Sequence, residues 1–221
     1  MLRLRDPVSR DAIIRSYTPI SDTAKQGFMD VLVKIYFDTR GGAKGGRMSQ
    51  AMDSLPLGHA VDFKGPIGKF EYLGRGRCAI NGEERHVKRF AMICAGSGIT
   101  PIFQIFRAVM QDPEDPTTCT VLNGNRLVED ILCKEDIDAL VKSNEGRARV
   151  VYTLTRPPTE GEGRGKWEGL TGRIGKELVE REGGRPGEGG MVLICGPEAM
   201  EKGVRVALKE LGWKDDKVLF F

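Results

Sequence analysis

The stretch Phe90-Ala91-Met92-Ile93-Cys94-Ala95-Gly96-Ser97-Gly98-Ile99-Thr100-Pro101 decides the fold of the C-terminal part of the chain. Its first six residues are apolar without alternation, which is typical of a strand buried on both faces. A Gly-Ser-Gly turn follows, and Pro101 then stands in the first turn of a predicted helix, where its fixed φ and missing N–H are tolerated. Strand, glycine turn and helix together predict the opening unit of a parallel sheet.

The rest of the C-terminal part repeats this alternation of strands and helices. Further strands are predicted at 118–122, 150–154, 191–195 and 218–221, and helices at 99–110, 130–142, 173–182 and 198–211. Strands that alternate with helices in this way form a doubly wound parallel sheet with helices on both faces.

The N-terminal part has a different pattern. Strands are predicted at 12–17, 28–37, 60–64 and 70–73, with one short helix near 48–54. In the stretch 28–37 every odd-numbered residue is apolar, which is the period-two pattern of a half-buried strand. We therefore expect an antiparallel β-barrel domain over residues 1–73, a hinge over 74–88, an α/β domain over 89–221, and a mobile loop at 157–166.

Composition excludes several classes of protein. The chain has 221 residues, of which 40% are hydrophobic and 29% charged, and its net charge is +3, so neither disorder nor nucleic-acid binding is favoured. It contains no apolar run long enough to cross a membrane and no export signal at its start. The five cysteines form no C-x-x-C pair and the two histidines are isolated, so we expect reduced thiols, a cytoplasmic location and no metal site.

Two turns at strand ends are candidate parts of a ligand site. Gly96 and Gly98 would let the backbone approach a pyrophosphate at a helix N-terminus. Cys195-Gly196-Pro197 follows another buried strand, and the carboxyl ends of parallel strands share one edge of the sheet, so both turns should face one crevice. The alternatives are a glycine turn that only packs helix on strand, and an inert buried thiol at Cys195.

A third candidate is Arg15-Ser16-Tyr17-Thr18-Pro19-Ile20-Ser21. The Arg15 guanidinium could clamp a phosphate, and Tyr17 could lie against an aromatic ring. The alternative is an amphipathic strand that ends in a turn.

Six motifs occur in an order that resembles the ferredoxin-NADP reductase superfamily. Within it the chain is most similar to cytochrome b5 reductases and to the flavin region of eukaryotic nitrate reductases, those of fungi in particular. The motifs are R-x-Y-T-P-x-S from Arg15, Val33-Lys34-Ile35-Tyr36, Gly45-Gly46-Arg47-Met48-Ser49-Gln50, Gly65-Pro66-x-Gly68, Gly96-Ser97-Gly98-Ile99-Thr100-Pro101, and Cys195-Gly196-Pro197 near a C-terminal aromatic residue.

The resemblance implies that the N-terminal domain binds FAD. It places Arg15 at the pyrophosphate and Tyr17 along the flavin, a second segment near the adenylate half, and a third where a helix N-terminus meets the phosphates. The matching residues are Arg15, Tyr17, Thr18 and Ser21, then Lys34 and Tyr36, then Gly46, Arg47, Met48 and Ser49.

The resemblance also implies that the C-terminal domain binds a nicotinamide nucleotide. Thr100 would sit beside the flavin, and Cys195 would position the nicotinamide against it, which makes these two the candidate catalytic residues. The nucleotide cleft would be lined by Gly96, Gly98, Thr155, Arg156, Gly196 and Pro197. The implied activity is transfer of a hydride from NAD(P)H to FAD and then of single electrons to a b-type haem domain on a longer chain.

Thr155 bears on the choice between NADPH and NADH. Many members of this family carry an acidic residue at the matching position, and a carboxylate there accepts from the ribose 2′-OH and repels a 2′-phosphate. Thr155 cannot repel it, and Arg156 or Arg126 could pair with it, so we expect NADPH to be favoured. The alternative is that these arginines are solvated loop charges.

The chain departs from the family in three respects. Only 14 residues precede Arg15, so the flavin barrel is expected to lack its first two strands. Asn123-Gly124-Asn125 stands where many relatives have an aromatic residue before the asparagine, and Glu198-Ala199 follows Cys195-Gly196-Pro197 where many have proline. Two alternatives to a nitrate reductase flavin module stay open, namely a stand-alone cytochrome b5 reductase, which shares all the motifs, and a truncated nucleotide-binding module that lacks FAD and activity.

Overall fold

The computed structural model describes residues 1–5, 9, 11–22, 25–39, 42, 44–158 and 167–221. The chain divides into two compact units, Met1–Gly68 and Lys69–Phe221, which are described separately below. The predicted loop at 157–166 lies almost wholly outside the described residues. No helix within the described ranges is both long and apolar enough to cross a membrane.

The first unit is built on a three-stranded antiparallel sheet. β1 (Leu2–Arg5) lies between β2 (Ala12–Arg15) and β3 (Asp62–Phe63), and α1 (Arg47–Asp53) packs against it. Strand and helix share a small core that comprises Leu2, Leu4, Ile13, Met48 and Ala51. The predicted antiparallel architecture is confirmed, and the described residues of this unit form an open sheet.

The prediction of a strand over 28–37 is wrong in extent. The segment pairs through a single bridge between Pro19 and Val31, supported by a hydrogen bond from the Ile20 N–H to the Asp30 carbonyl. Both apolar and polar positions from 31 to 35 are half-buried, so the odd-numbered face is not selectively covered. An alternating pattern indicates that one face of an extended segment can be buried. It does not ensure that another segment lies alongside to form the backbone hydrogen bonds of a strand.

A second antiparallel sheet opens the other unit, and it occupies the residues for which the sequence suggested a hinge. It contains β4 (Phe70–Gly74), β5 (Arg77–Ile80) and β6 (Glu83–His86). The two connecting pairs, Arg75-Gly76 and Asn81-Gly82, all have positive φ, as a type I′ turn requires. Residues 70–86 therefore form two tight hairpins that share β5.

Tyr72 fixes this small sheet to the rest of its unit. Its hydroxyl donates to the Asp115 carboxylate and accepts from the Gly76 N–H at 2.9 Å. The Arg75 N–H also donates to Asp115, at 2.9 Å. The rings of Tyr72 and Phe90 meet edge to face with centroids 5.9 Å apart, so the small sheet is joined to the rest of the unit by polar and aromatic contacts.

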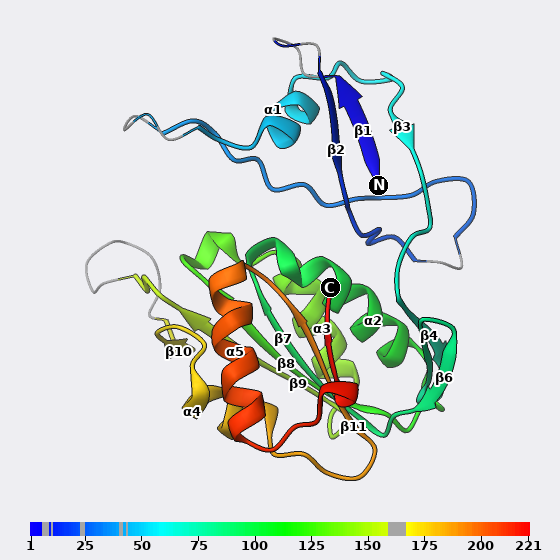
Figure 1. Ribbon diagram of the computed structural model, residues 1–221, viewed down its shortest axis with the longest axis vertical. Helices are drawn as coiled ribbons and strands as arrows, with labels where there is room; N and C mark the ends of the chain where they lie inside the picture. Colours follow the sequence, from blue (N-terminus) through cyan, green and yellow to red (C-terminus); the bar gives the residue numbers. More distant parts are fainter. Residues whose placement is uncertain (6–8, 10, 23–24, 40–41, 43, 159–166) are drawn as a thin grey trace. The chain divides into compact units, whose positions relative to one another are not determined.

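The main sheet of the second unit has six parallel strands in the order β10-β9-β8-β7-β11-β12. The first strand in the sequence, β7, is central, and the chain winds outward from it in both directions (Figure 1). The strands are β7 (Arg89–Ala95), β8 (Thr118–Asn125), β9 (Ala148–Leu154), β10 (Leu170–Thr171), β11 (Gly190–Cys195) and β12 (Val218–Phe220). This confirms the predicted doubly wound fold.

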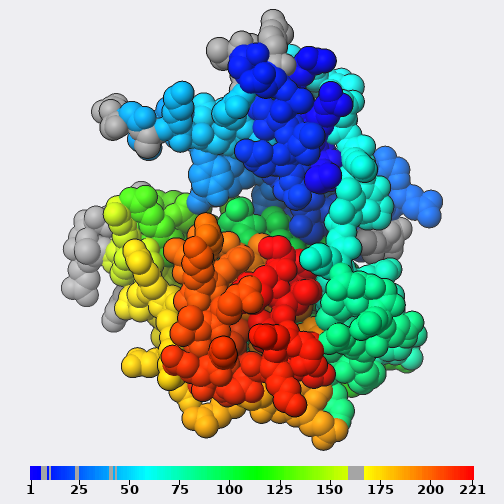
Figure 2. Space-filling model, in the orientation of Figure 1, coloured from blue at the N-terminus to red at the C-terminus, as the bar shows by residue number. Residues whose placement is uncertain are grey.

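Helices cover both faces of this sheet. α2 (Ile99–Gln111) and α3 (Lys134–Ser143) pack on one face, and α5 (Glu198–Glu210) packs on the other (Figure 1). Figure 2 shows α5 beside the C-terminal residues, where the Arg205 guanidinium lies 3.8 Å from the centre of the Phe220 ring. The core under α5 contains Ala91, Ile93, Leu122, Val192, Ile194, Val204, Leu208 and Trp213.

Two predicted helices differ from those observed. The helix expected at 130–142 begins only at Lys134, because a 3₁₀ turn occupies Val128–Asp130 and Cys133, at the N-cap, has φ 56°. The helix expected at 173–182 is one short turn, α4 (Lys176–Leu178), followed by a π-helical turn over Val179–Gly183. Flanking glycines shorten this element, since Gly184 has φ 73°.

Phe90 should anchor the second unit, because it is fully buried and its ring meets Phe70 and Tyr72 edge to face. We expect Phe90→Ala to lower the free energy of unfolding by about 3–5 kcal/mol, measured by urea denaturation. Val206→Ala on α5, where the side chain is 58% exposed, is the control and should change it by less than about 0.5 kcal/mol. A similar small loss for both variants would contradict this account of the core.

Candidate functional site

The first unit brings together two of the three predicted flavin segments. The Gly46 N–H donates to the Tyr36 carbonyl at 2.8 Å, and the Tyr36 N–H donates to the Ser49 hydroxyl at 3.1 Å. The buried Ser49 hydroxyl in turn donates to the Gly46 carbonyl at 2.9 Å. These bonds fix the start of α1 against the extended segment that carries Lys34 and Tyr36.

Glycine is required where these segments meet. A Cβ atom on Gly46 would lie 2.6 Å from the Ser49 hydroxyl oxygen, and one on Gly45 would lie 2.1 Å from the Tyr36 carbonyl oxygen. The contact at Gly45 is with backbone, so a side chain there would force the two segments apart, whereas the contact at Gly46 is with the Ser49 hydroxyl and would disturb its hydrogen bonds. The two glycines therefore allow the start of α1 to approach Tyr36 as closely as it does.

The first predicted flavin segment lies close to the second. Partial burial raises the pKa of Tyr17, while the positive charge of Arg15 opposes this rise and Tyr36 adds to it, so these three side chains influence one another. Tyr17 also packs against the core of the unit. Farther along the same segment, the Ser21 hydroxyl accepts a hydrogen bond from the Asp30 N–H at 3.1 Å. Thr18, which follows Tyr17 in the sequence, is half-buried.

This arrangement fits FAD. The Tyr17 ring suits the flat surface of a flavin, the Tyr36 ring suits the adenylate half of the cofactor, and the Arg15 guanidinium suits a pyrophosphate. The Arg47 guanidinium donates to the Ser9 hydroxyl at 2.8 Å and lies 3.6 Å from the Asp11 carboxylate, and its role toward the FAD phosphates stays a prediction. Met48, from the same motif, is a buried core residue.

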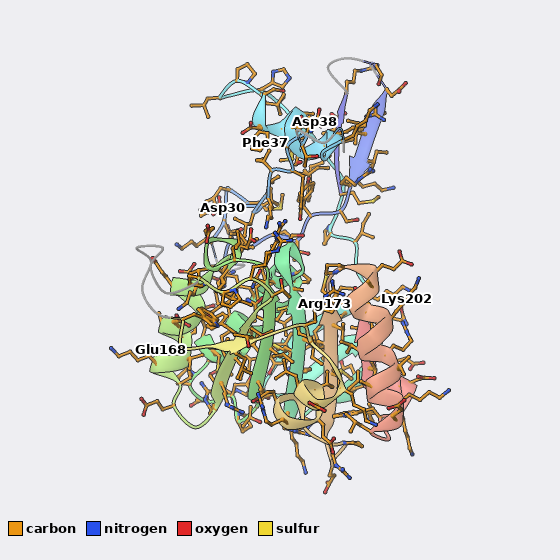
Figure 3. The ribbon with its side chains drawn as sticks, turned by 90° about the vertical axis from the view of Figure 1, so that its left-hand side faces the viewer. Asp30, Phe37, Asp38, Glu168, Arg173 and Lys202 are labelled. Carbon is orange, nitrogen blue, oxygen red and sulfur yellow. The ribbon has the colours of Figure 1, made fainter. Side chains whose placement is uncertain are left out.

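Asp38 and Gln50 complete this part of the site, and the sequence analysis missed both. Figure 3 shows Asp38 beside α1, where its carboxylate accepts from the Gly45 N–H at 2.6 Å and from the Gln50 amide at 3.2 Å. The bond from Gly45, with that from Gln50, lowers the pKa of Asp38. Gln50 ends the third motif and was visible in the sequence, whereas no local pattern marks Asp38.

In the second unit, the two turns predicted to share a crevice do meet. β7 and β11 are neighbours, and Cys94 pairs in register with Cys195. A Cβ atom on Gly98 would lie 2.2 Å from the Cys195 carbonyl oxygen and 2.9 Å from the Gly196 nitrogen. The chain continues from β7 to β8 on one side and returns to β11 on the other, so the turns lie at the topological switch point, where such sheets bind ligands.

Thr100 and Cys195 are held differently. Thr100 is buried in the first turn of α2, and its hydroxyl donates to the Ser97 carbonyl at 3.1 Å. Burial, with a smaller contribution from the Glu201 charge, raises the pKa of Cys195 to about 11. The Cys195 thiol is therefore protonated at neutral pH and can contribute only as a neutral group.

Thr155 and Arg156 extend β9 past its end. The Thr155 N–H donates to the Asn125 carbonyl at 3.0 Å, and the Arg156 N–H donates to the Arg126 carbonyl at 2.9 Å. All three side chains predicted to choose between the nucleotides, those of Arg126, Thr155 and Arg156, are exposed. The structure thus brings them together at the carboxyl edge of the sheet.

A buried amide pair lies beneath this edge. The Asn125 amide donates to the Asn123 side-chain oxygen at 2.8 Å, and both residues are almost fully buried. Within the described part of the chain, Asn123 Nδ2 and Asn125 Oδ1 have no hydrogen-bond partner. The sequence showed this pair only as a departure from the family pattern.

Comparison with protein-family models identifies two domains. Residues 1–72 match an oxidoreductase FAD-binding domain, and residues 92–206 match an oxidoreductase NAD-binding domain. Among curated proteins, the chain is 58% identical over its whole length to "Nitrate reductase [NADPH]" of Leptosphaeria maculans and 54% identical to that of Aspergillus niger. It spans 24% and 25% of the lengths of those two proteins.

A solved structure agrees with these matches. The cytochrome b5 reductase domain of Ulva prolifera nitrate reductase is 32% identical, with a TM-score of 0.89 over all of this chain and 82% of that one. The fold and its two cofactor segments define an FAD- and NAD(P)H-dependent flavoprotein reductase module. The chain belongs to the ferredoxin-NADP reductase superfamily, in the cytochrome b5 reductase-like branch that includes the flavin region of nitrate reductases.

Gly98 provides a test of the switch-point site. Because a methyl group at Gly98 would force the two turns apart, we expect Gly98→Ala to weaken NADP⁺ binding by about tenfold or more, a loss of about 1.4 kcal/mol. Isothermal titration calorimetry of the full chain measures it. Gly203→Ala on α5, where nothing lies within 4 Å of the added Cβ, is the control and should bind as wild type does. Equal NADP⁺ affinity of Gly98→Ala and Gly203→Ala would show that the nucleotide does not bind at the turns that contain Gly98 and Cys195.

Proposed function

We propose that this chain is the flavin portion of an assimilatory NADPH nitrate reductase, taking a hydride from NADPH and delivering electrons one at a time to a b-type haem domain. The observation that carries the proposal is the contact of the Gly98 backbone with the Cys195–Gly196 turn at the switch point. The junction of three flavin segments around Tyr36 supports it. So do relatives of this name that match the whole chain.

The residues of the chain position the reactants in this scheme. When bound, FAD supplies the chemistry that converts a two-electron hydride donor into a one-electron donor. Arg15 and Tyr17 would hold its pyrophosphate and ring system, and Lys34, Tyr36 and the residues from Gly46 to Ser49 would complete its site. Gly96, Gly98, Gly196 and Pro197 would hold the nicotinamide nucleotide. Thr100 would face the flavin, and the neutral Cys195 thiol would orient the nicotinamide.

The preference for NADPH is proposed from the side chains at the ends of β8 and β9. Arg126 and Arg156 are joined through their backbones at 2.9 Å and leave both guanidinium groups exposed at this edge. Thr155 directly precedes Arg156 and carries no carboxylate that would repel a 2′-phosphate. Guanidinium groups bind phosphates through paired hydrogen bonds, which supports NADPH as the donor.

The haem partner and the location are proposed from less direct observations. The curated relatives are about four times as long as this chain, which leaves room in them for domains that accept electrons and reduce nitrate. We propose that the acceptor lies on such a longer chain. All five cysteines are unpaired, which is consistent with a reducing, cytoplasmic environment.

A flavin spectrum tests the proposed reaction directly. The chain would be purified with added FAD, gel-filtered, and mixed with NADPH in the absence of air. We expect a bound flavin spectrum that bleaches with NADPH and recovers when oxidised cytochrome b5 is added, because electrons then leave singly to the haem. A colourless protein, or a flavin that NADPH does not reduce, would contradict the proposal. Reduction without transfer to cytochrome b5 would contradict the haem acceptor alone.

Thr155 tests the choice of nucleotide. We expect Thr155→Asp to lower the ratio of kcat/KM for NADPH to that for NADH by about tenfold, since the new carboxylate repels the 2′-phosphate. Ser143→Asp adds the same charge at the far end of α3, where the side chain is exposed, and should leave the ratio unchanged. An unaltered ratio in Thr155→Asp would show that this position does not contact the 2′-phosphate.

A further inference from the structure

The start of α5 is held by a side chain that belongs to none of the motifs above. The Gly196 N–H donates to Glu201 Oε1 at 3.1 Å. Glu201 lies in the first turn of α5 and is half-buried, so its side chain reaches back along the helix to the residue before Pro197. Pro197 has no N–H, and its side chain makes no cap at the start of the helix. The Glu201 carboxylate instead accepts a hydrogen bond from the N–H of the preceding residue, Gly196.

The same turn is enclosed by two further contacts. The Gly98 backbone lies against the Cys195 carbonyl, so close that a Cβ would be 2.2 Å away. A Cβ on Gly196 would meet the Met200 methyl carbon at 2.5 Å. Gly98, Met200 and Glu201 thus restrict the turn from different directions, and Glu201 alone among them holds it by a charged hydrogen bond.

We propose that Glu201 is a positioning residue that fixes the Cys195–Gly196 turn in the conformation that receives the nicotinamide nucleotide. The proposal rests on the function proposed above for this turn. It deepens that function by assigning the geometry of the turn to a carboxylate one helical turn away, which touches neither the nucleotide nor the flavin.

A role in capping the helix does not by itself require a charged side chain at position 201. A glutamine could accept the same hydrogen bond without placing a negative charge near a site for an anionic dinucleotide, where such a charge is unfavourable. The charge does act on Cys195, whose pKa it raises in addition to burial. Cys94, which is fully buried on the adjacent strand, also interacts with this thiol.

The charge therefore has a consequence for the thiol. A protonated Cys195 is a poor nucleophile and resists oxidation, because the thiolate is the reactive form. Glu201 would thus hold the turn and keep its thiol unreactive, two effects that substitution can separate.

Three variants of the full chain separate these effects. Glu201→Ala removes both the hydrogen bond and the charge, and Glu201→Gln removes only the charge. Glu198→Gln is the matched control, because Glu198 lies in the same helical turn but pairs with Lys202 at 2.6 Å. Lys202 projects from α5 on the side away from the sheet (Figure 3). Circular dichroism would first establish that each variant is folded.

Binding of NADP⁺ measures the hold on the turn. We expect Glu201→Ala to raise the Kd by about tenfold, and Glu201→Gln and Glu198→Gln to stay within about twofold of wild type. An unchanged Kd in folded Glu201→Ala would overturn the proposal. If the wild-type chain itself fails to bind NADP⁺, the proposed function fails, and the next measurement alone decides whether Glu201 holds the turn.

Alkylation of Cys195 by iodoacetamide, followed across pH by mass spectrometry without nucleotide, provides that measurement. For Glu201→Gln the rise in rate with pH should move to lower pH, with a rate at pH 9 about threefold or more above wild type, because the thiolate is no longer opposed by a neighbouring charge. Glu201→Ala should react faster still. Cys133, half-buried on another element, is the internal control and should not change. Identical Cys195 profiles in Glu201→Ala and Glu201→Gln would show that loss of the hydrogen bond does not loosen the turn, and would overturn the proposal.

Discussion

The second unit depends on the pairing of β7 with β11. These strands are consecutive in space but far apart in sequence, and the chain departs from β7 in one direction and returns to β11 from the other. Both strands are almost entirely buried, so hydrophobic burial fixes their register, and the register brings the Gly-Ser-Gly and Cys-Gly-Pro turns together. Neither turn could form half of a nucleotide site by itself. The chemistry at this edge is a consequence of packing deep in the sheet.

The first unit reaches a comparable result by other means. Its core is small, and the segments predicted to hold FAD are extended chain rather than long strands. Position is maintained there by hydrogen bonds around Tyr36, Gly46 and Ser49, and by the lack of side chains on two glycines. The two units thus illustrate two ways to place backbone atoms accurately. The second unit relies on the register between buried strands, and the first unit relies on hydrogen bonds at the start of α1.

The fold and the position of the candidate site could be predicted from the sequence where the residue types themselves indicate burial. The apolar run 90–95 located β7 to within one residue, and parallel-strand topology then brought Gly98 and Cys195 to one edge. Prediction failed where the local structure depends on contacts with segments distant in the sequence. Alternation over 28–37 did not create a long strand, and Asp38 and Glu201 bind N–H groups of turns whose positions are set by tertiary structure. The roles of individual residues toward FAD and NADPH stay predictions.

The small sheet of β4, β5 and β6 has a consequence for dissecting the protein. Asn-Gly and Arg-Gly pairs gave this stretch the composition of a linker, yet Tyr72 and Arg75 bind Asp115, and Phe70 and Tyr72 pack on Phe90. A recombinant fragment that began at residue 89 would expose the Phe90 ring and leave the Asp115 carboxylate without these donors. An isolated nucleotide-binding fragment should therefore begin at residue 69, and crystallisation or NMR work on this half of the molecule should retain both hairpins.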